Sequence, residues 1–141
     1  MDISYKQAQE LINDEYLLPS LLNLFSFLKE ERKHINWIGL YLYKDNRLVL
    51  GPYAGKPACS ILNLEKGVCA LSFNKQKIIN VKDVSLFPGH IYCDNNSKSE
   101  LVLPLKNKLG VLDIDSDILN RFQEEDISFY KAILKLINER L

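Results

Sequence analysis

The stretch INWIGLYLYKDNRLVLGPYAG, residues 35–55, decides the fold of this chain. Residues 35–43 alternate between two kinds of side chain, which predicts a β-strand. Asp45 and Asn46 follow as a short turn, and residues 47–53 continue as a second strand. The stretch therefore predicts a β-hairpin.

The first strand of this hairpin presents two different faces, because successive side chains of a strand point to opposite sides. One face carries the aliphatic side chains of Ile38, Leu40 and Leu42. The other face carries Gly39 together with the aromatic side chains of Trp37, Tyr41 and Tyr43. The aliphatic face predicts a core. On the aromatic face, Gly39 would leave a gap between two rings that a small apolar group could enter. Plain aromatic packing is the alternative.

Helical patterns flank the predicted sheet at both ends of the chain. Loose helical spacing covers residues 5–18 and stops before Pro19, and a second amphipathic helix is expected from Pro19 to about 32. A closing helix at about 123–140 begins with the acidic run 124–126, which suits a helix N-terminus.

Shorter elements lie between these ends. Strands are expected at 59–64, 77–81, 100–105 and 109–115, with a short helix at 68–75. Residues 82–99 show no periodic pattern, and an irregular segment of that length in a small domain is usually functional or disordered.

This order of elements predicts an α+β fold, with helices packed on a mostly antiparallel central sheet. At 141 residues the chain is expected to form a single domain, 1–141. The domain would comprise N-terminal helices at 1–33, a sheet core at 34–116 and the C-terminal helix at 123–140.

The charge balance argues against two classes of partner. Lys plus Arg and Asp plus Glu both number 18, so the formal net charge is zero. A neutral chain has no general attraction to nucleic acid or to an anionic membrane.

The N-terminus does not resemble a secretory signal, and no apolar run is long enough to span a bilayer. We therefore expect a cytoplasmic protein, in which permanent disulfides are uncommon.

Three cysteines are the first candidates for chemistry. None forms a CxxC pair and no histidine lies at metal-ligand spacing, so no metal site is expected. Cys93 lies in the polar loop GHIYCDNNS and Cys59 in another irregular stretch, where an accessible thiolate could act as a redox nucleophile. Cys69, in the first turn of a short helix, would gain thiolate character there. Three buried cysteines acting as small apolar side chains are the alternative, and pairing of His90 with Cys93 stays open.

Carboxylates form the second candidate group. In LGVLDID, 109–115, Asp113 and Asp115 fall on one strand face, roughly 6.5–7 Å apart. At that separation both can meet one cation, and their mutual repulsion should raise at least one pKa, so that a carboxyl could donate a proton. Glu100 would be a third carboxylate at the same place if the 100–105 and 109–115 strands pair. A solvated strand end is the alternative.

Taken together, these residues resemble the free methionine-R-sulfoxide reductase family of GAF domains. The matching blocks, in the family's order, are NWIGLY (36–41), LVLGPYAGKPAC (48–59), GVCA (67–70), FPGHIYCDNNSKSELVLPL (87–105), LGVLDIDS (109–116) and RFQEED (121–126). The spacing of all three cysteines also fits the family pattern.

The resemblance implies one reaction for the scattered features. Cys93 would attack the sulfur of free methionine-R-sulfoxide and become a sulfenic acid, while a protonated carboxyl delivers a proton to the departing oxygen. That carboxyl would be one of Glu100, Asp113 and Asp115. Cys59, or as second choice Cys69, would then condense with the sulfenic acid. External thioredoxin would reduce the disulfide, and no cofactor would be bound.

The resemblance also implies how the substrate is held. The same three carboxylates would bind its free ammonium, and Trp37 and Tyr41 would flank its methyl group. Backbone N–H groups of the 90–93 loop, including those of Ile91 and Tyr92, would receive its α-carboxylate. A homodimer is implied as well. The alternatives are a GAF module that senses a small molecule without catalysis, and a thiol redox switch that would need only Cys59 and Cys93.

Overall fold

The computed structural model describes residues 3–91, 93 and 96–141. Its centre is a six-stranded sheet in the order β3-β2-β1-β6-β5-β4, in which every neighbouring pair is antiparallel. The strands are β1 (Ile35–Lys44), β2 (Arg47–Gly55), β3 (Ile61–Leu62), β4 (Ile79–Val81), β5 (Ser99–Pro104) and β6 (Gly110–Ser116). The predicted hairpins β1–β2 and β5–β6 both form, which confirms the α+β, mostly antiparallel architecture.

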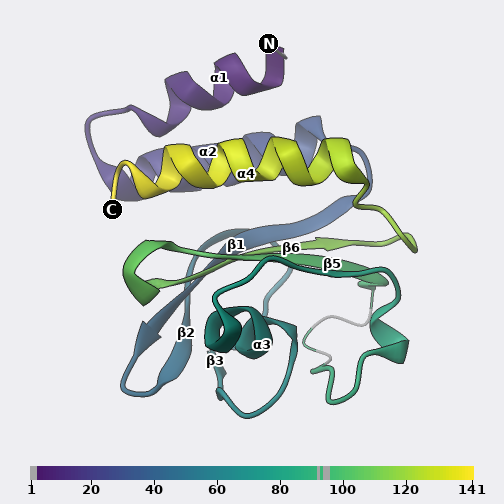
Figure 1. Ribbon diagram of the computed structural model, residues 1–141. Helices are drawn as coiled ribbons and strands as arrows, with labels where there is room; N and C mark the ends of the chain where they lie inside the picture. Colours follow the sequence, from purple (N-terminus) through teal and green to yellow (C-terminus); the bar gives the residue numbers. More distant parts are fainter. Residues whose placement is uncertain (1–2, 92, 94–95) are drawn as a thin grey trace.

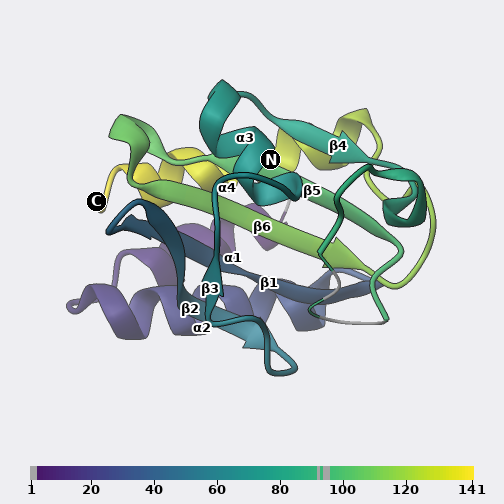
Figure 2. The same ribbon diagram turned by 90° about the horizontal axis from the view of Figure 1, so that it is seen from below.

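Helices cover both faces of the sheet, but unequally (Figure 1). On one face lie α1 (Ile3–Ile12), α2 (Leu17–Glu31) and α4 (Glu124–Asn138). The other face carries α3 (Val68–Lys75), and Figure 2 shows it from that side together with β3 and the loops around them. Short 3₁₀ turns occur at Val84–Leu86 and Lys106–Lys108. The sheet thus separates a helical layer from a more irregular layer.

Helix α2 begins earlier than the sequence predicts. The expected boundary was Pro19, yet α2 starts at Leu17 and Pro19 occupies its third position. The first N–H groups of a helix have no intrahelical acceptor, so a proline in the first turn does not interrupt the hydrogen bonding. Proline therefore marks the first turn as expected, but not the first residue.

Helix α4 begins where the acidic run predicts. The backbone N–H of Gln123, the residue before α4, donates to Asp126 Oδ2 at 2.9 Å.

Strand β3 is shorter than the sequence predicts, because it covers only two residues of the expected 59–64 segment. Cys59 lies before β3, outside the sheet, and its side chain forms a disulfide with Cys93.

The two faces of β1 belong to two separate cores, as its alternation predicts. Ile38 and Leu40 are buried beneath the three helices of one layer. Trp37 and Tyr41 are buried in the second core, which α3 covers. No helix in the described ranges is long and apolar enough to cross a membrane.

Candidate active site

A pocket lies on the α3 face of the sheet, in the second core. It has a cavity volume of about 50 Å³ and combines apolar walls with buried ionisable groups. Of the residues that the sequence singles out, those that line it are Trp37, Tyr41, Cys69, His90, Ile91, Cys93, Glu100, Asp113 and Asp115. Tyr92 lies outside the described residues.

Strand register brings the three carboxyl groups together. Glu100 of β5 lies opposite Asp115 of β6. Two residues earlier on β6, Asp113 faces the same side of the sheet, because alternate residues of a strand share a face. The expected hairpin is therefore present, and Glu100 is the third carboxyl at this position, as predicted.

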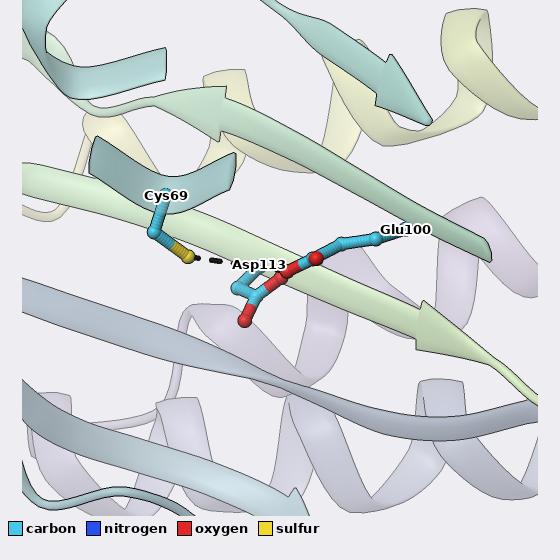
Figure 3. Close-up of side chains that lie close together, drawn as sticks. All are labelled: Cys69, Glu100 and Asp113. Carbon is cyan, nitrogen blue, oxygen red and sulfur yellow. Dashed lines mark hydrogen bonds between the residues drawn. The ribbon is translucent and has the colours of Figure 1, made fainter. Parts of the chain in front are cut away.

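The α3 helix adds a thiol to this group (Figure 3). Cys69 Sγ lies 4.0 Å from Glu100 Oε2, and single donor atoms of Cys69, Glu100 and Asp113 all lie within 4.8 Å of one another. All three side chains are almost fully buried, at 5%, 6% and 5% exposure. We call these three residues the buried triad.

Burial controls the ionisation of the two carboxyls in the buried triad. Loss of solvation, reinforced by the charge of Asp115, raises the pKa of Glu100 from 4.5 to about 8. Burial and then the neighbouring Glu100 raise the pKa of Asp113 well above its usual value. A carboxyl here therefore keeps its proton near neutral pH and can donate it, as predicted, although burial and not repulsion between Asp113 and Asp115 is the main cause.

The expected thiolate character of Cys69 is wrong. Cys69 is the second residue of α3, close to the positive end of the helix dipole. Burial nevertheless raises the pKa of its thiol well above 9.0, and the charges of Asp113 and Glu100 raise it further. The helix terminus is outweighed because the thiol is removed from water and faces carboxyl groups.

Asp113 also has one oxygen without a hydrogen-bond donor among the described residues. Its Oδ1 is buried and accepts no hydrogen bond from any residue that the structure describes. A buried acceptor without a donor is unfavourable by about 1–3 kcal/mol. A cationic or N–H group of a bound molecule would satisfy it.

The other two cysteines are joined to each other. Cys59 and Cys93 form a disulfide across 34 residues of sequence, with their Cα atoms 5.4 Å apart. Cys69 is the free cysteine. The structure therefore contains the pairing that the resemblance implied as first choice.

The aromatic side chains on this face stack on one another and leave no gap between their rings. The rings of Trp37 and Tyr41 are stacked with centroids 5.9 Å apart, and Tyr53 stacks on Trp37 at 5.1 Å. A Cβ on Gly39 would collide with the Cβ of Tyr53. Of the two possibilities for this face, the structure shows plain aromatic packing and not a gap beside Gly39: the glycine admits the neighbouring strand β2.

The polar tips of these aromatic residues hold the segment that contains Cys59, a role that sequence reasoning missed. The hydroxyl of Tyr41 donates to the carbonyl of Cys59 at 2.8 Å. The Trp37 indole N–H donates to the carbonyl of Lys56 at 3.2 Å. Both residues thus line the pocket and also position one half of the disulfide.

The loop that carries Cys93 is partly ordered by its own backbone. The N–H of His90 donates to the Phe87 carbonyl and that of Cys93 to the Ile91 carbonyl, each at 3.2 Å. The N–H groups of His90 and Cys93 therefore already donate within the loop, whereas the sequence predicts the 90–93 backbone as a binding site for a carboxylate. The buried His90 ring places Nε2 3.6 Å from Glu100 Oε1, and burial lowers the pKa of His90.

Among the pocket residues that were not predicted, Gly67 and Lys66 have distinctive properties. Gly67, directly before α3, has a φ of 100°, and a Cβ there would lie 3.2 Å from Ile91 Cδ1. Lys66 brings a cationic side chain to the rim. The signal for Gly67 was its position at the start of a predicted helix, whereas nothing in the sequence distinguishes Lys66 from other surface lysines.

Known proteins resemble this chain closely in sequence. No family model matches it. The free methionine-R-sulfoxide reductase of Escherichia coli is 46% identical over 112 residues, which cover 77% of this chain and 68% of that protein. GAF domain-containing protein A of Dictyostelium discoideum is 42% identical over 132 residues, covering 91% and 83%.

Solved structures share the fold over nearly the whole chain. The reduced form of fRMsr of Staphylococcus aureus superposes with a TM-score of 0.91 at 43% identity, covering 99% of this chain and 93% of that one. Free methionine-R-sulfoxide reductase of Neisseria meningitidis, in complex with its substrate, gives a TM-score of 0.89 at 32% identity, covering 97% and 85%.

Proposed function

This chain belongs to the free methionine-R-sulfoxide reductase family of GAF domains, and from that premise we propose that it reduces free L-methionine-(R)-S-oxide to L-methionine. The observation that carries the proposal is the Cys59–Cys93 disulfide beside a pocket that contains three carboxyl groups. Such a disulfide is the product that remains after a sulfenic acid has reacted with a second thiol.

The first step transfers oxygen from the substrate to Cys93. The Cys93 thiol gives up its proton and its sulfur attacks the sulfoxide sulfur, while a carboxyl donates a proton to the oxygen. Glu100, with a pKa of about 8, is protonated at neutral pH and suits this role. The hydroxyl then moves to the Cys93 sulfur as the sulfur–oxygen bond and the transient bond between the two sulfurs break. The products are methionine and the Cys93 sulfenic acid, and the proton lost from the thiol restores the carboxyl.

The second step closes the disulfide. The Cys59 thiol attacks the sulfenic acid of Cys93, the sulfur–sulfur bond forms and water leaves. Cys59 fits this role better than Cys69, because Cys59 is bonded to Cys93 while burial raises the pKa of the Cys69 thiol. A dithiol of thioredoxin then reduces the disulfide by thiol exchange, so no bound cofactor takes part.

Substrate recognition uses the groups that remain. The substrate ammonium binds the carboxyl group of Asp113, whose Oδ1 has no described partner, together with Glu100 and Asp115. Trp37 and Tyr41 contact the methyl group. A methionine inside a peptide has no ammonium, so these buried acceptors would stay unsatisfied, and we expect strong preference for the free amino acid.

The α-carboxylate of the substrate binds the backbone N–H of Ile91 and, as the resemblance implies, that of Tyr92. Two expectations about the whole protein accompany this proposal. The resemblance favours a homodimer, and dependence on thioredoxin favours a cytoplasmic location.

A coupled assay tests the proposed function. Purified protein, thioredoxin, thioredoxin reductase and NADPH are mixed with free methionine-R-sulfoxide, and NADPH consumption is followed. We expect turnover on the R epimer, none on the S epimer or a peptide-bound sulfoxide, and none with Cys93→Ser. Activity that survives Cys93→Ser would reassign the nucleophile. Absence of turnover in folded, reduced protein would reject the reductase and favour a sensor.

A further inference from the structure

We propose that the buried triad of Cys69, Glu100 and Asp113 also binds a thiophilic divalent cation, of the Zn²⁺ or Cd²⁺ class, which inhibits the enzyme. The triad joins one sulfur and two carboxyl groups from α3, β5 and β6, with single donor atoms all within 4.8 Å of one another (Figure 3). In a tetrahedral zinc site the metal–ligand bonds of about 2.0–2.3 Å hold neighbouring donors roughly 3.3–3.8 Å apart. The 4.0 Å between Cys69 Sγ and Glu100 Oε2 exceeds that spacing by only a few tenths of an ångström, so a small side-chain movement would bring the two donors to it.

Asp113 supplies an independent reason to expect a cation. Its side chain is only 5% exposed and lines the pocket, yet Oδ1 accepts no hydrogen bond within the described part of the chain. A metal ion would satisfy this oxygen directly. The case for a bound cation therefore rests on this Asp113 oxygen as well as on the Cys69 thiol.

The chemistry of the surrounding groups selects the class of ion. His90 Nε2 lies 3.6 Å from Glu100 Oε1, so its imidazole is close enough to exchange that contact for a metal ion as a fourth ligand. A set of sulfur, nitrogen and carboxylate oxygen favours zinc and cadmium over magnesium and calcium, which prefer oxygen alone. Spacing along the sequence could not reveal the set, because residues 69, 90, 100 and 113 come from four separate segments.

The ion would act as an inhibitor rather than a cofactor. The proposed reduction needs no metal, and the same Asp113 and Glu100 would bind the substrate ammonium. Metal and substrate would therefore exclude each other. This competition rests on the proposed function, whereas binding of the ion does not.

The oxidised protein allows a direct binding test. With Cys59 and Cys93 joined, Cys69 is the one thiol among the chain's 3 cysteines. Binding of Cd²⁺ would displace the thiol proton into solvent, so titration should produce a thiolate-to-cadmium charge-transfer band that saturates at one equivalent. Cys69→Ser should abolish the band. We expect Asp113→Asn or Glu100→Gln to weaken binding by about tenfold or more, while the exposed control Asp117→Asn leaves it unchanged.

Each outcome of the titration has a meaning. Circular dichroism and the intact disulfide would first confirm that every variant is folded. Absence of the band in oxidised wild-type protein would overturn the proposal, as would equal affinity in Asp113→Asn and Glu100→Gln. The two carboxyl variants protect the test against the failure of either one to fold.

A single-turnover experiment then tests inhibition. Reduced protein is mixed with free methionine-R-sulfoxide without thioredoxin, and methionine formation is measured with and without Cd²⁺. We expect slower formation that excess substrate or a chelator restores. Inhibition that is unchanged in Cys69→Ser would locate the ion on Cys59 and Cys93 and overturn the competition. If no turnover occurs at all, the proposed function fails, and the oxidised-protein titration still decides metal binding.

Discussion

Replacing Glu100 by glutamine should change how the stability of this protein depends on pH. Burial raises the pKa of Glu100 from 4.5 to about 8, so the folded protein binds the proton more tightly than the unfolded chain does. The resulting stabilisation is fully present below about pH 4.5 and is lost as the pH rises through about 8. Glutamine resembles the protonated carboxyl in shape and cannot ionise.

The size of the effect follows from the shift in pKa. A difference of roughly 3.5 pH units corresponds to about 5 kcal/mol of unfolding free energy, of which about 4 kcal/mol is lost between pH 5 and pH 9. The Glu100→Gln variant should lack this loss. Asp113 would still titrate, so the variant keeps a smaller slope of its own. The advantage of Glu100→Gln should therefore be small near pH 5 and should reach several kcal/mol near pH 9.

Urea unfolding of the oxidised protein measures this difference. The single tryptophan, Trp37, is buried in the second core, on the α3 face of the sheet, so its fluorescence reports unfolding. Asp117→Asn, which changes a half-exposed carboxylate, serves as the control. Wild-type and Glu100→Gln curves of free energy against pH that run parallel from about pH 5 to pH 9 would refute the reasoning.

Three further predictions concern the disulfide and the β1–β2 contact. Cys59→Ser should release about one equivalent of methionine and then stall with thioredoxin, because no resolving thiol remains; continued NADPH consumption would argue for Cys69. Oxidation of Cys59 and Cys93 closes a loop of 34 residues and should raise the unfolding free energy by about 4 kcal/mol, with no such rise in Cys59→Ser, by urea titration with and without reductant. Gly39→Ala should lower stability by about 2 kcal/mol or more, because its Cβ would meet the Cβ of Tyr53; an unchanged urea midpoint would contradict that collision.

The parts of the structure that sequence predicted are those set by local pattern. The alternation in 35–43 identified both faces of β1, because side-chain period and face are directly linked in a strand. The position of Glu100 beside Asp115 was also predictable, since the two strands are joined by a short turn. Pairing between neighbouring strands therefore predicted how the carboxyl groups of the site come together.

What sequence missed depends on contacts between distant segments. The start of α3 predicted a more acidic Cys69 thiol, but burial against β5 and β6 reversed the direction of its pKa shift. Gly39 looked like an empty position, whereas strand β2 fills it. The proximity of His90 to Glu100 likewise follows from the path of an irregular loop, for which no periodic signal exists.

Strand β6 makes the site and the core inseparable. Leu112 and Ile114 lie in the core beneath the helices, while Asp113 and Asp115 line the pocket on the opposite face. A slip of β6 by a single residue would put carboxyl groups under the helices and leucine in the pocket. A misaligned molecule would therefore fail to fold rather than fold with a defective site. In a metal-free, reduced preparation of this protein, the fraction of native molecules should equal the fraction able to bind substrate.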